Sequence, residues 1–325
     1  MTGSDAPLIL AVPSKGRLKE QVEAWLSDCG LKLSVAGGAR GYMAELKGVT
    51  GVQVRLLSAG DIAEALDAGE AHLGVTGEDL LRERGGDLEA RVLLLRALGF
   101  GRADLVVAAP RSWIDVDAMA DLEEVAHDML ARTGRRMRVA TKYVVQTRDF
   151  FARHGLSDYR IAESGGATEG APAAGMAEIV VDITTTGATL AANGLKVISD
   201  GTILRSQAQL AAALRAGWSA AQFAAADRFL RIVEARAAAH ETATLAWPPD
   251  PREEPVVERL ISEGAIRRPN GLLVPAHRIA EASMALAAAG LGPVTVSRPD
   301  FVYETACAPS AALAGRLNFD RSVKT

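Results

Sequence analysis

The residues whose types and spacing best suit chemistry lie between positions 178 and 195. An apolar, β-branched run over residues 179–183 is typical of a buried strand and carries Asp182 near its C-terminal end. A segment rich in hydroxyl groups follows at once, made of Thr184, Thr185, Thr186, Gly187, Ala188 and Thr189. The order of strand, loop and helix start suits a phosphate group, because free backbone N–H groups and hydroxyls can donate hydrogen bonds to an anion.

Composition alone leaves open whether this loop binds phosphate or only caps a helix, because threonine before a helix often satisfies its first N–H groups. The Walker pattern G-x-x-x-x-G-K-S/T and the dinucleotide pattern G-x-G-x-x-G are both absent from the stretch. Asp182 narrows the range of possible ligands. A carboxylate about 4 Å from a phosphate is repelled by roughly 4 kcal/mol at an effective dielectric constant of 20. It is tolerable beside ribose hydroxyls or a divalent cation, so a sugar phosphate with Mg²⁺ is the predicted ligand.

Length and charge set the limits for the rest of the chain. Its 325 residues suffice for two or three domains, and 36 basic against 40 acidic residues give a net charge of −4. This balance argues against a general role on nucleic acid or on a membrane surface. The two cysteines, Cys29 and Cys307, match no metal-binding spacing and predict reduced thiols in a cytoplasmic protein. No secretion signal or apolar run long enough to span a membrane is recognisable.

Strands alternate with helices through the first 245 residues, which predicts an α/β fold with parallel sheets. Charged residues follow several of the predicted strands, where α/β folds place ligand groups. The turn of Lys15, Gly16 and Arg17 is one example, although a solvated turn explains it equally well. Residues 206–239 are rich in alanine and predict helix, and a proline-rich linker follows at 248–255.

Four segments, in order, resemble motifs of the ATP phosphoribosyltransferases, the family of the first enzyme of histidine biosynthesis. Residues 11–18 (AVPSKGRL) resemble the family's N-terminal K-G-R-L turn, and residues 74–79 (GVTGED) resemble its G-I-T-G-x-D turn. Residues 138–143 (RVATKY) resemble its K-Y motif. Residues 166–172 (GATEGAP) and 182–190 (DITTTGATL) resemble its phosphoribosyl-binding signature, which is the most specific of the four.

The resemblance implies an α/β fold with two lobes like those of type II periplasmic binding proteins, and a small C-terminal α+β domain. The first lobe would comprise residues 1–101 and 196–247, the second residues 102–195 with the phosphoribosyl-binding loop, and the C-terminal domain residues 248–325. The implied reaction transfers the phosphoribosyl group of phosphoribosyl pyrophosphate to N1 of ATP, with Mg²⁺, and releases pyrophosphate.

The resemblance also implies a site. Asp182 and Glu169 would act on the ribose as catalytic residues, with Arg55 at the departing pyrophosphate, and residues 184–189 would bind phosphoribosyl pyrophosphate. Mg²⁺ would be held mainly through the substrate, near the two carboxylates. The residues expected to bind ATP or pyrophosphate are Lys15, Gly16, Arg17, Arg40, Gly77, Asp79 and Lys142.

The end of the chain raises the question of regulation. The family's long form ends in a βαββαβ domain that binds histidine and inhibits the enzyme, and residues 246–325 have about that length, although one strand is not evident. Histidine is therefore an expected inhibitor. The family also implies a homo-oligomer, either dimer or hexamer, and its short form uses a regulatory subunit resembling histidyl-tRNA synthetase.

Two other functions compete with the enzyme. A two-lobed fold can also serve as a ligand-sensing or solute-binding module, because fold does not fix function. The pair Glu169 and Asp182 beside a phosphate loop argues against a sensor of a neutral metabolite. A non-catalytic regulatory paralogue is the second alternative, and the presence of every expected motif residue argues against it.

Overall fold

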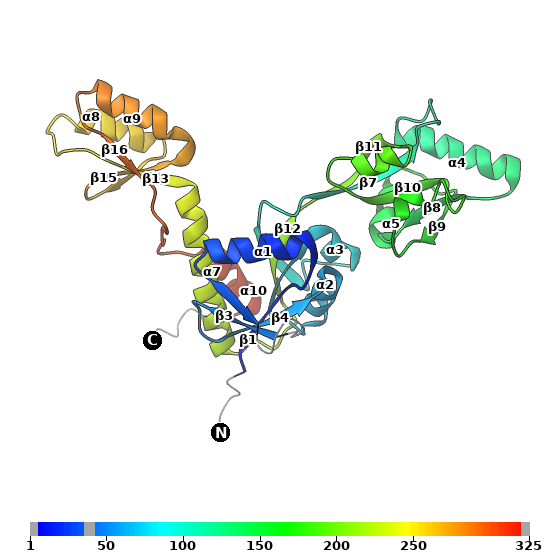
Figure 1. The fold of residues 1–325 in the computed structure, drawn as a ribbon, viewed down its shortest axis with the longest axis horizontal. Coiled ribbons are helices and arrows are strands. Elements are labelled where there is room, and N and C mark those ends of the chain that lie inside the picture. Colours follow the sequence, from blue (N-terminus) through cyan, green and yellow to red (C-terminus); the bar gives the residue numbers. More distant parts are fainter. Residues whose placement is uncertain (1–5, 36–42, 320–325) are drawn as a thin grey trace. The chain divides into compact units, whose positions relative to one another are not determined.

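The computed structural model describes residues 6–35 and 43–319. The chain divides into two compact units. The first contains most of the residues up to Ser219, and the second contains residues 220–325 with two short segments, 25–32 and 47–51. Figure 1 labels the helices and strands of both units.

The first unit contains a mixed seven-stranded sheet, parallel at its centre and antiparallel where β3 and β12 pair, which carries several predicted ligand loops. Strand β1 is parallel to both β4 and β5, so the loops after β1 and β5 meet at one edge of the sheet. Helices α1 (Gly16–Asp28), α2 (Ala59–Ala68) and α3 (Glu78–Glu83) follow these strands. In spatial order the strands are β2 (Lys32–Val35), β3 (Met43–Lys47), β4 (Val52–Leu57), β1 (Leu8–Pro13), β5 (Leu73–Gly77), β12 (Ala208–Ala213) and β6 (Val92–Ala97).

The helix predicted for the start of the alanine-rich segment is wrong, because residues 208–213 form strand β12. All six of its residues are buried, and it lies antiparallel between β5 and β6. Alanine favours helix in isolation, but here a small side chain fits between neighbouring strands and the covering helices. Only the second half of the segment is helical, as α7 (Ala220–His240).

A five-stranded sheet carries the phosphoribosyl-binding signature. Strand β10 lies parallel to β8, so Lys142 and the threonine loop follow neighbouring strands at the same edge. Helices α4 (Met119–Thr133) and α5 (Val144–Arg153) and the short α6 (Ala188–Ala192) accompany the sheet, and buried apolar clusters lie against it. Its strands, in spatial order, are β11 (Leu195–Ser206), β7 (Ala103–Pro110), β10 (Ile179–Thr184), β8 (Met137–Thr141) and β9 (Tyr159–Glu163).

The chain passes between these two sheets twice. It leaves the first sheet through residues 98–102 and returns at Gln207, between β11 and β12. The sequence placed the return near residue 195, but β11 continues to Ser206 because its backbone pairs with β7. The crossings are joined by hydrogen bonds: Gly99 N–H donates to Gln207 Oε1 (3.0 Å), and Ala208 N–H donates to the Phe100 carbonyl (3.0 Å).

A third sheet, in the second unit, completes the βαββαβ order. The strand that the sequence did not reveal is β14 (Ile266–Arg268), which has three exposed residues and no apolar alternation. The other elements are β13 (Thr242–Ala246), α8 (Glu254–Ser262), β15 (Gly271–Pro275), α9 (Ile279–Ala288) and β16 (Thr295–Ser297). The spatial order is β14-β15-β13-β16, with antiparallel pairing throughout. The predicted fold class, α/β with a small C-terminal α+β domain, is therefore confirmed.

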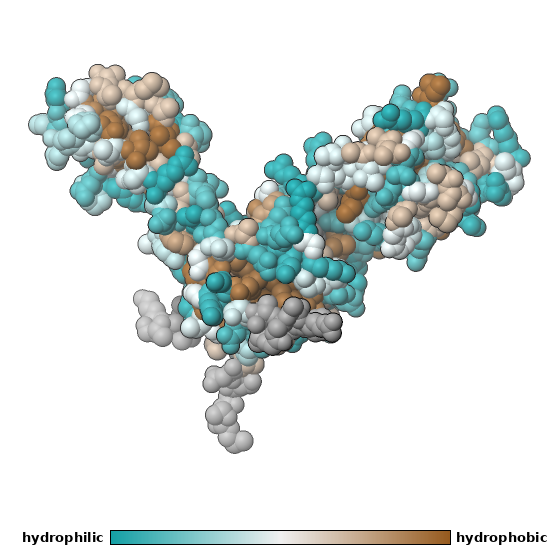
Figure 2. Space-filling view, viewed as in Figure 1, coloured by the Kyte–Doolittle hydropathy of each residue, from teal (hydrophilic) through white to brown (hydrophobic). Residues whose placement is uncertain are grey.

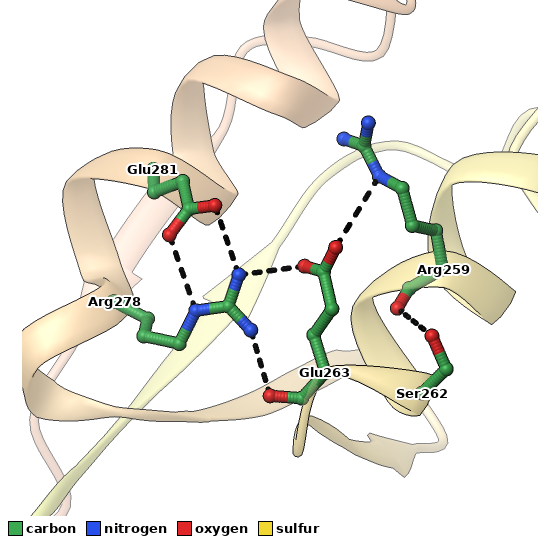
Figure 3. A network of polar contacts seen from close by, with 5 residues as sticks. All are labelled: Arg259, Ser262, Glu263, Arg278 and Glu281. Atoms are coloured by element: carbon green, nitrogen blue, oxygen red, sulfur yellow. Dashed lines mark hydrogen bonds and ion pairs between the residues drawn. The ribbon is translucent and has the colours of Figure 1, made fainter.

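An ion-pair network holds α8 to the start of α9 (Figure 3). The Arg278 guanidinium donates to Glu263 Oε2 (2.6 Å) and to Glu281 Oε1 (2.9 Å), and it also reaches the Glu263 carbonyl. Arg259 approaches the other oxygen of Glu263 at 4.0 Å. The same domain exposes several large apolar side chains, among them Ile261, Ile266, Met284 and Val296. Figure 2 shows brown, hydrophobic atoms on the visible face of this domain.

The last described helix, α10 (Ala308–Leu317), packs against α7. Ser310 Oγ donates to Asp227, and the Phe223 and Phe319 rings stack with centroids 4.9 Å apart. Leu313 is fully buried. The C-terminal segment is therefore part of the packed second unit. None of the described helices is long and apolar enough to cross a membrane.

Replacing Leu313 with alanine is expected to lower the free energy of unfolding by about 2–4 kcal/mol, because a buried leucine loses its contacts and leaves a cavity. Urea unfolding followed by circular dichroism measures this change. The exposed Ala312→Ser is the matched control and should change stability by less than about 0.5 kcal/mol. Equal effects of the two variants would contradict the packing of α10.

Candidate active site

A pocket of about 290 Å³ brings the predicted phosphoribosyl residues together. Both carboxylates and most of the threonine loop line it, and Ala103 of β7 closes one side. Gly187 alone of the predicted loop residues does not line it, although it shapes the turn with a φ of +74°. The lining residues from the prediction are Glu169, Asp182, Thr184, Thr185, Thr186, Ala188 and Thr189.

Hydrogen bonds within the loop fix its shape. The Gly187 N–H donates to Thr184 Oγ1 (2.8 Å), and the Thr185 hydroxyl donates to the Arg102 carbonyl (3.3 Å). Helix α6 has only five residues, so its dipole is small and the hydroxyls and loop amides carry more of the electrostatics than the sequence indicated. Thr184 therefore caps the turn and also lines the pocket, so the two roles are compatible.

The surroundings of Asp182 combine burial with two opposing charges. Burial raises the pKa of Asp182, and the nearby Glu169 carboxylate raises it further. The Ile183 N–H, which donates to Asp182 Oδ1 (2.8 Å), and the Lys142 ammonium lower the pKa, but the net shift is upward. A carboxylate held at some electrostatic cost is suited to interact with positive charge that develops on a bound ligand.

An ion pair fixes the strand that carries Asp182. Arg138 on β8 donates from Nη2 to Glu178 Oε1 (2.7 Å), and its backbone N–H donates to Glu178 Oε2 (2.6 Å). Burial alone would raise the pKa of Glu178, but these hydrogen bonds outweigh it and the net shift is downward. The pair holds the start of β10 beside β8. Asp182 and Lys142 lie four residues after Glu178 and Arg138, so the pair also positions these two residues relative to each other.

A second, more apolar pocket of about 580 Å³ adjoins the first. The two pockets share Ala103, Ile183 and Thr185 as lining residues, so they are neighbours. Arg17, Gly77 and Asp79, three of the residues predicted to bind ATP or pyrophosphate, line the second pocket. Phe100 and Arg102, from the crossing between the sheets, line it too. Neither residue was predicted to belong to the site. The signal that could have identified them is their position in a glycine-containing loop between two predicted strands.

The Asp79 carboxylate is buried and fully engaged by protein groups. Tyr143 Oη donates to Asp79 Oδ2 (2.7 Å), and Ser206 Oγ donates to Asp79 Oδ1 (2.8 Å). Burial raises the pKa of the Tyr143 phenol far above its ordinary value, and the Asp79 charge adds to the rise, so the phenol stays a donor. Neither Tyr143 nor Ser206 was predicted to have a role, although Tyr143 belongs to the K-Y motif.

Gly77 is required beside this carboxylate. A Cβ added at Gly77 would lie 2.2 Å from Asp79 Oδ1. Because both oxygens of Asp79 accept hydrogen bonds from buried hydroxyls, the carboxylate cannot move aside cheaply. The glycine of the G-V-T-G-E-D turn therefore makes room for an internal carboxylate.

The predicted basic residues lie in different places. Arg17 lines the apolar pocket, and Lys15 and Gly16 lie in the same turn after β1. Lys142 directly follows β8 and lines neither pocket. Arg55 Nη1 donates to the Glu70 carbonyl, just before β5, so its guanidinium reaches toward the N-terminal ends of the parallel strands and not toward the loops. The structure does not bring Arg55 to either pocket, and its role toward pyrophosphate stays a prediction. Arg40 lies outside the described residues.

Two carboxylates in one small pocket are compatible with Mg²⁺ bridged through a substrate, since Mg²⁺ commonly takes one or two protein carboxylates together with phosphate oxygens and waters. Within residues 6–35 and 43–319, no group of three or more His, Cys, Asp or Glu side chains could hold a metal ion by itself. Mg²⁺ held mainly through the substrate stays a prediction.

Fold and site together define an α/β protein of the phosphoribosyl-binding class. Comparison with known proteins agrees: the family model described as ATP phosphoribosyltransferase matches residues 58–232. The chain belongs to the ATP phosphoribosyltransferase family, and its function is the first step of histidine biosynthesis.

Curated relatives named ATP phosphoribosyltransferase match at high identity. One from Caulobacter vibrioides (strain NA1000 / CB15N) is 66% identical over 301 residues, which is 92% of this chain and 94% of the relative. One from Bradyrhizobium sp. (strain ORS 278) is 58% identical over 233 residues, or 72% of each chain. The ATP phosphoribosyl transferase (HisG:HisZ) complex from Thermotoga maritima contains a chain with a similar fold: the TM-score is 0.53 and the identity 24%, covering 70% of this chain and 96% of that one.

Proposed function

We propose that the smaller pocket binds the phosphoribosyl group and the adjoining apolar pocket binds ATP. The observation that carries this proposal is that Ala103, Ile183 and Thr185 line both pockets, which are therefore neighbours. Two substrates bound side by side would react as one complex, which removes most of the entropic cost of their encounter.

In this arrangement residues 184–189 hold the 5′-phosphate, and Asp182 and Glu169 face the ribose. Adenine N1 forms a bond to ribose C1 with its lone pair, while the bond from C1 to pyrophosphate breaks and its electrons leave with pyrophosphate. Positive charge develops on the ribose as the bond lengthens, and the two carboxylates stabilise it. Lys142 and Arg17, with Lys15, are the side chains that we assign to the leaving pyrophosphate. Mg²⁺, bound mainly through the substrate, would neutralise part of the pyrophosphate charge.

The test is the absorbance change when the purified chain is mixed with ATP, phosphoribosyl pyrophosphate and Mg²⁺, with pyrophosphate removed enzymatically. Product formation by the lone chain would support the site and show that no second subunit is obligatory. Binding of phosphoribosyl pyrophosphate without product would indicate a missing partner. Absence of both binding and product, with and without Mg²⁺, would contradict the assigned pockets.

We propose regulation by histidine through the C-terminal domain. Support comes from the βαββαβ order of residues 242–297, which matches the expected inhibitory domain. Histidine titrated into the assay is expected to lower the rate, and Trp247 fluorescence, with the other tryptophans replaced by phenylalanine, would report binding to the domain itself. A flat titration in both measurements would refute the assignment.

Partners and location remain proposals of the same kind. The Thermotoga maritima structure is a complex with HisZ, and its matching chain leaves about 30% of the present chain uncovered. We propose a cytoplasmic homo-oligomer, a dimer or hexamer. A HisZ-type subunit, resembling histidyl-tRNA synthetase, is the alternative source of regulation. Light scattering of the purified protein gives the subunit number, and the lone-chain assay decides whether the second subunit is needed.

A further inference from the structure

Helix α3 supplies two carboxylates to the beginning of α5. Asp79, in its first turn, accepts the hydrogen bond from Tyr143 Oη at 2.7 Å. Glu83, at its end, accepts from the backbone N–H groups of Val145 (2.8 Å) and Gln146 (3.3 Å), which are free donors at a helix N-terminus. The Gln146 side chain closes the junction by donating to the Asp79 carbonyl (2.9 Å). An element of the first sheet thereby fixes the start of a helix of the second.

The position of Asp79 is itself tightly determined. Its side chain and backbone both contact Ser206, because Ser206 Oγ donates to Oδ1 (2.8 Å) and accepts from the Asp79 N–H (3.0 Å). The residue is only 5% exposed, and the absence of a side chain at Gly77 leaves room for its carboxylate. Tyr143, at 1% exposed, is equally enclosed. A buried bond between two fixed groups can hold a geometry that exposed contacts could not.

Lys142 lies directly before Tyr143, and its ammonium lies over the Tyr143 ring, 5.0 Å from the centroid. Lys142 lines neither pocket, but it directly follows β8, which lies parallel to the strand that carries Asp182, and its charge lowers the pKa of Asp182. We propose that Asp79 and Tyr143 form a positioning pair, which orients the Tyr143 ring and so keeps the Lys142 ammonium on the side of Asp182 in the phosphoribosyl pocket. This inference rests on the proposed assignment of that pocket and of Lys142. It changes the expected role of Asp79 from nucleotide ligand to internal support.

A double-mutant cycle between Tyr143 and Lys142 tests the proposal. Tyr143→Phe removes the hydrogen bond and keeps the ring, and it is expected to lower kcat/KM for phosphoribosyl pyrophosphate about tenfold, with KM for ATP changed less than twofold. In a Lys142→Met background the same substitution is expected to lower kcat/KM less than twofold, because the group it positions is already absent. The same tenfold loss in both backgrounds would overturn the proposal, as would an effect confined to KM for ATP.

Ser206→Ala removes the other donor to the Asp79 carboxylate and leaves α5 untouched. Because Ser206 helps to fix Asp79, kcat/KM is expected to fall about two- to fivefold, and less than twofold in the Lys142→Met background. Leu313→Ala, which is destabilised and lines neither pocket, is the control and should keep kcat/KM within about twofold of the wild type. A tenfold loss in Leu313→Ala would show that destabilisation alone causes the effect. Glu83→Gln weakens the other α3–α5 contact and gives a second cycle with Lys142→Met should Tyr143→Phe fail to fold. Wild-type turnover and phosphoribosyl pyrophosphate binding test the pocket separately.

Discussion

Replacing Asp182 with asparagine is expected to lower kcat by about two to three orders of magnitude while leaving the fold intact. The substitution keeps the size of the side chain but removes the negative charge that faces the ribose, where positive charge develops in the transition state. Phosphoribosyl pyrophosphate should still bind, because the threonine loop is unchanged. Steady-state rates with both substrates saturating measure the loss, and an unchanged rate would remove Asp182 from the mechanism.

The stability of this variant separates catalysis from folding. Burial raises the pKa of Asp182 in the folded protein above its ordinary value of 3.8. Between the unfolded and folded pKa values the folded state binds more protons, so this group's contribution to stability falls as pH rises through that window. At neutral pH the buried charge is therefore unfavourable, and Asp182→Asn should be at least as stable as the wild type. Urea unfolding at neutral pH tests this, and a marked destabilisation would assign the lost activity to misfolding.

Asp117→Asn makes the same chemical change at a carboxylate that is 76% exposed and does not line either pocket. Its turnover should stay close to that of the wild type. A comparable loss in this control would mean that the assay responds to surface charge and not to the charge at the ribose.

Replacing Gly187 with valine is expected to raise KM for phosphoribosyl pyrophosphate about ten- to thirtyfold. Crowding is not the cause, because an added Cβ would meet no atom within 4 Å. The cost lies in the backbone, because φ is +74° and an L-residue pays about 1–2 kcal/mol there, with a β-branched one at the upper end. The loop would leave the conformation in which the Gly187 N–H reaches Thr184 Oγ1.

Gly134→Val provides a matched control for Gly187→Val. Gly134 ends α4 with a φ of +68°, has no atom within 4 Å of an added Cβ, and does not line either pocket. The two substitutions should therefore cost similar stability, and only Gly187→Val should change substrate affinity. Isothermal titration with phosphoribosyl pyrophosphate gives both affinities, and normal binding by Gly187→Val would contradict the loop geometry.

Local patterns in the sequence determined the phosphoribosyl pocket. Asp182 and residues 184–189 are contiguous, so a strand followed by a turn was enough to bring them together. Glu169 joined them through a family resemblance, and the pocket contains it as expected. The parallel strands β8 and β10 explain why Lys142 lies nearby, since side chains that follow neighbouring parallel strands meet at one edge.

Contacts between distant segments depended on the tertiary structure. Alanine-rich β12 is a strand because β5 and β6 offer hydrogen bonds on both sides, which outweighs a modest helix propensity. The partners of two predicted site residues could not be predicted from the sequence either. The Arg55 guanidinium donates to the Glu70 carbonyl. The Asp79 carboxylate accepts hydrogen bonds from Tyr143 and Ser206. Sequence alone determined which groups exist and which neighbours along the chain they share. Only the folded chain decided which distant donors reach them, because burial makes every unpaired polar atom costly and so selects its partner in space.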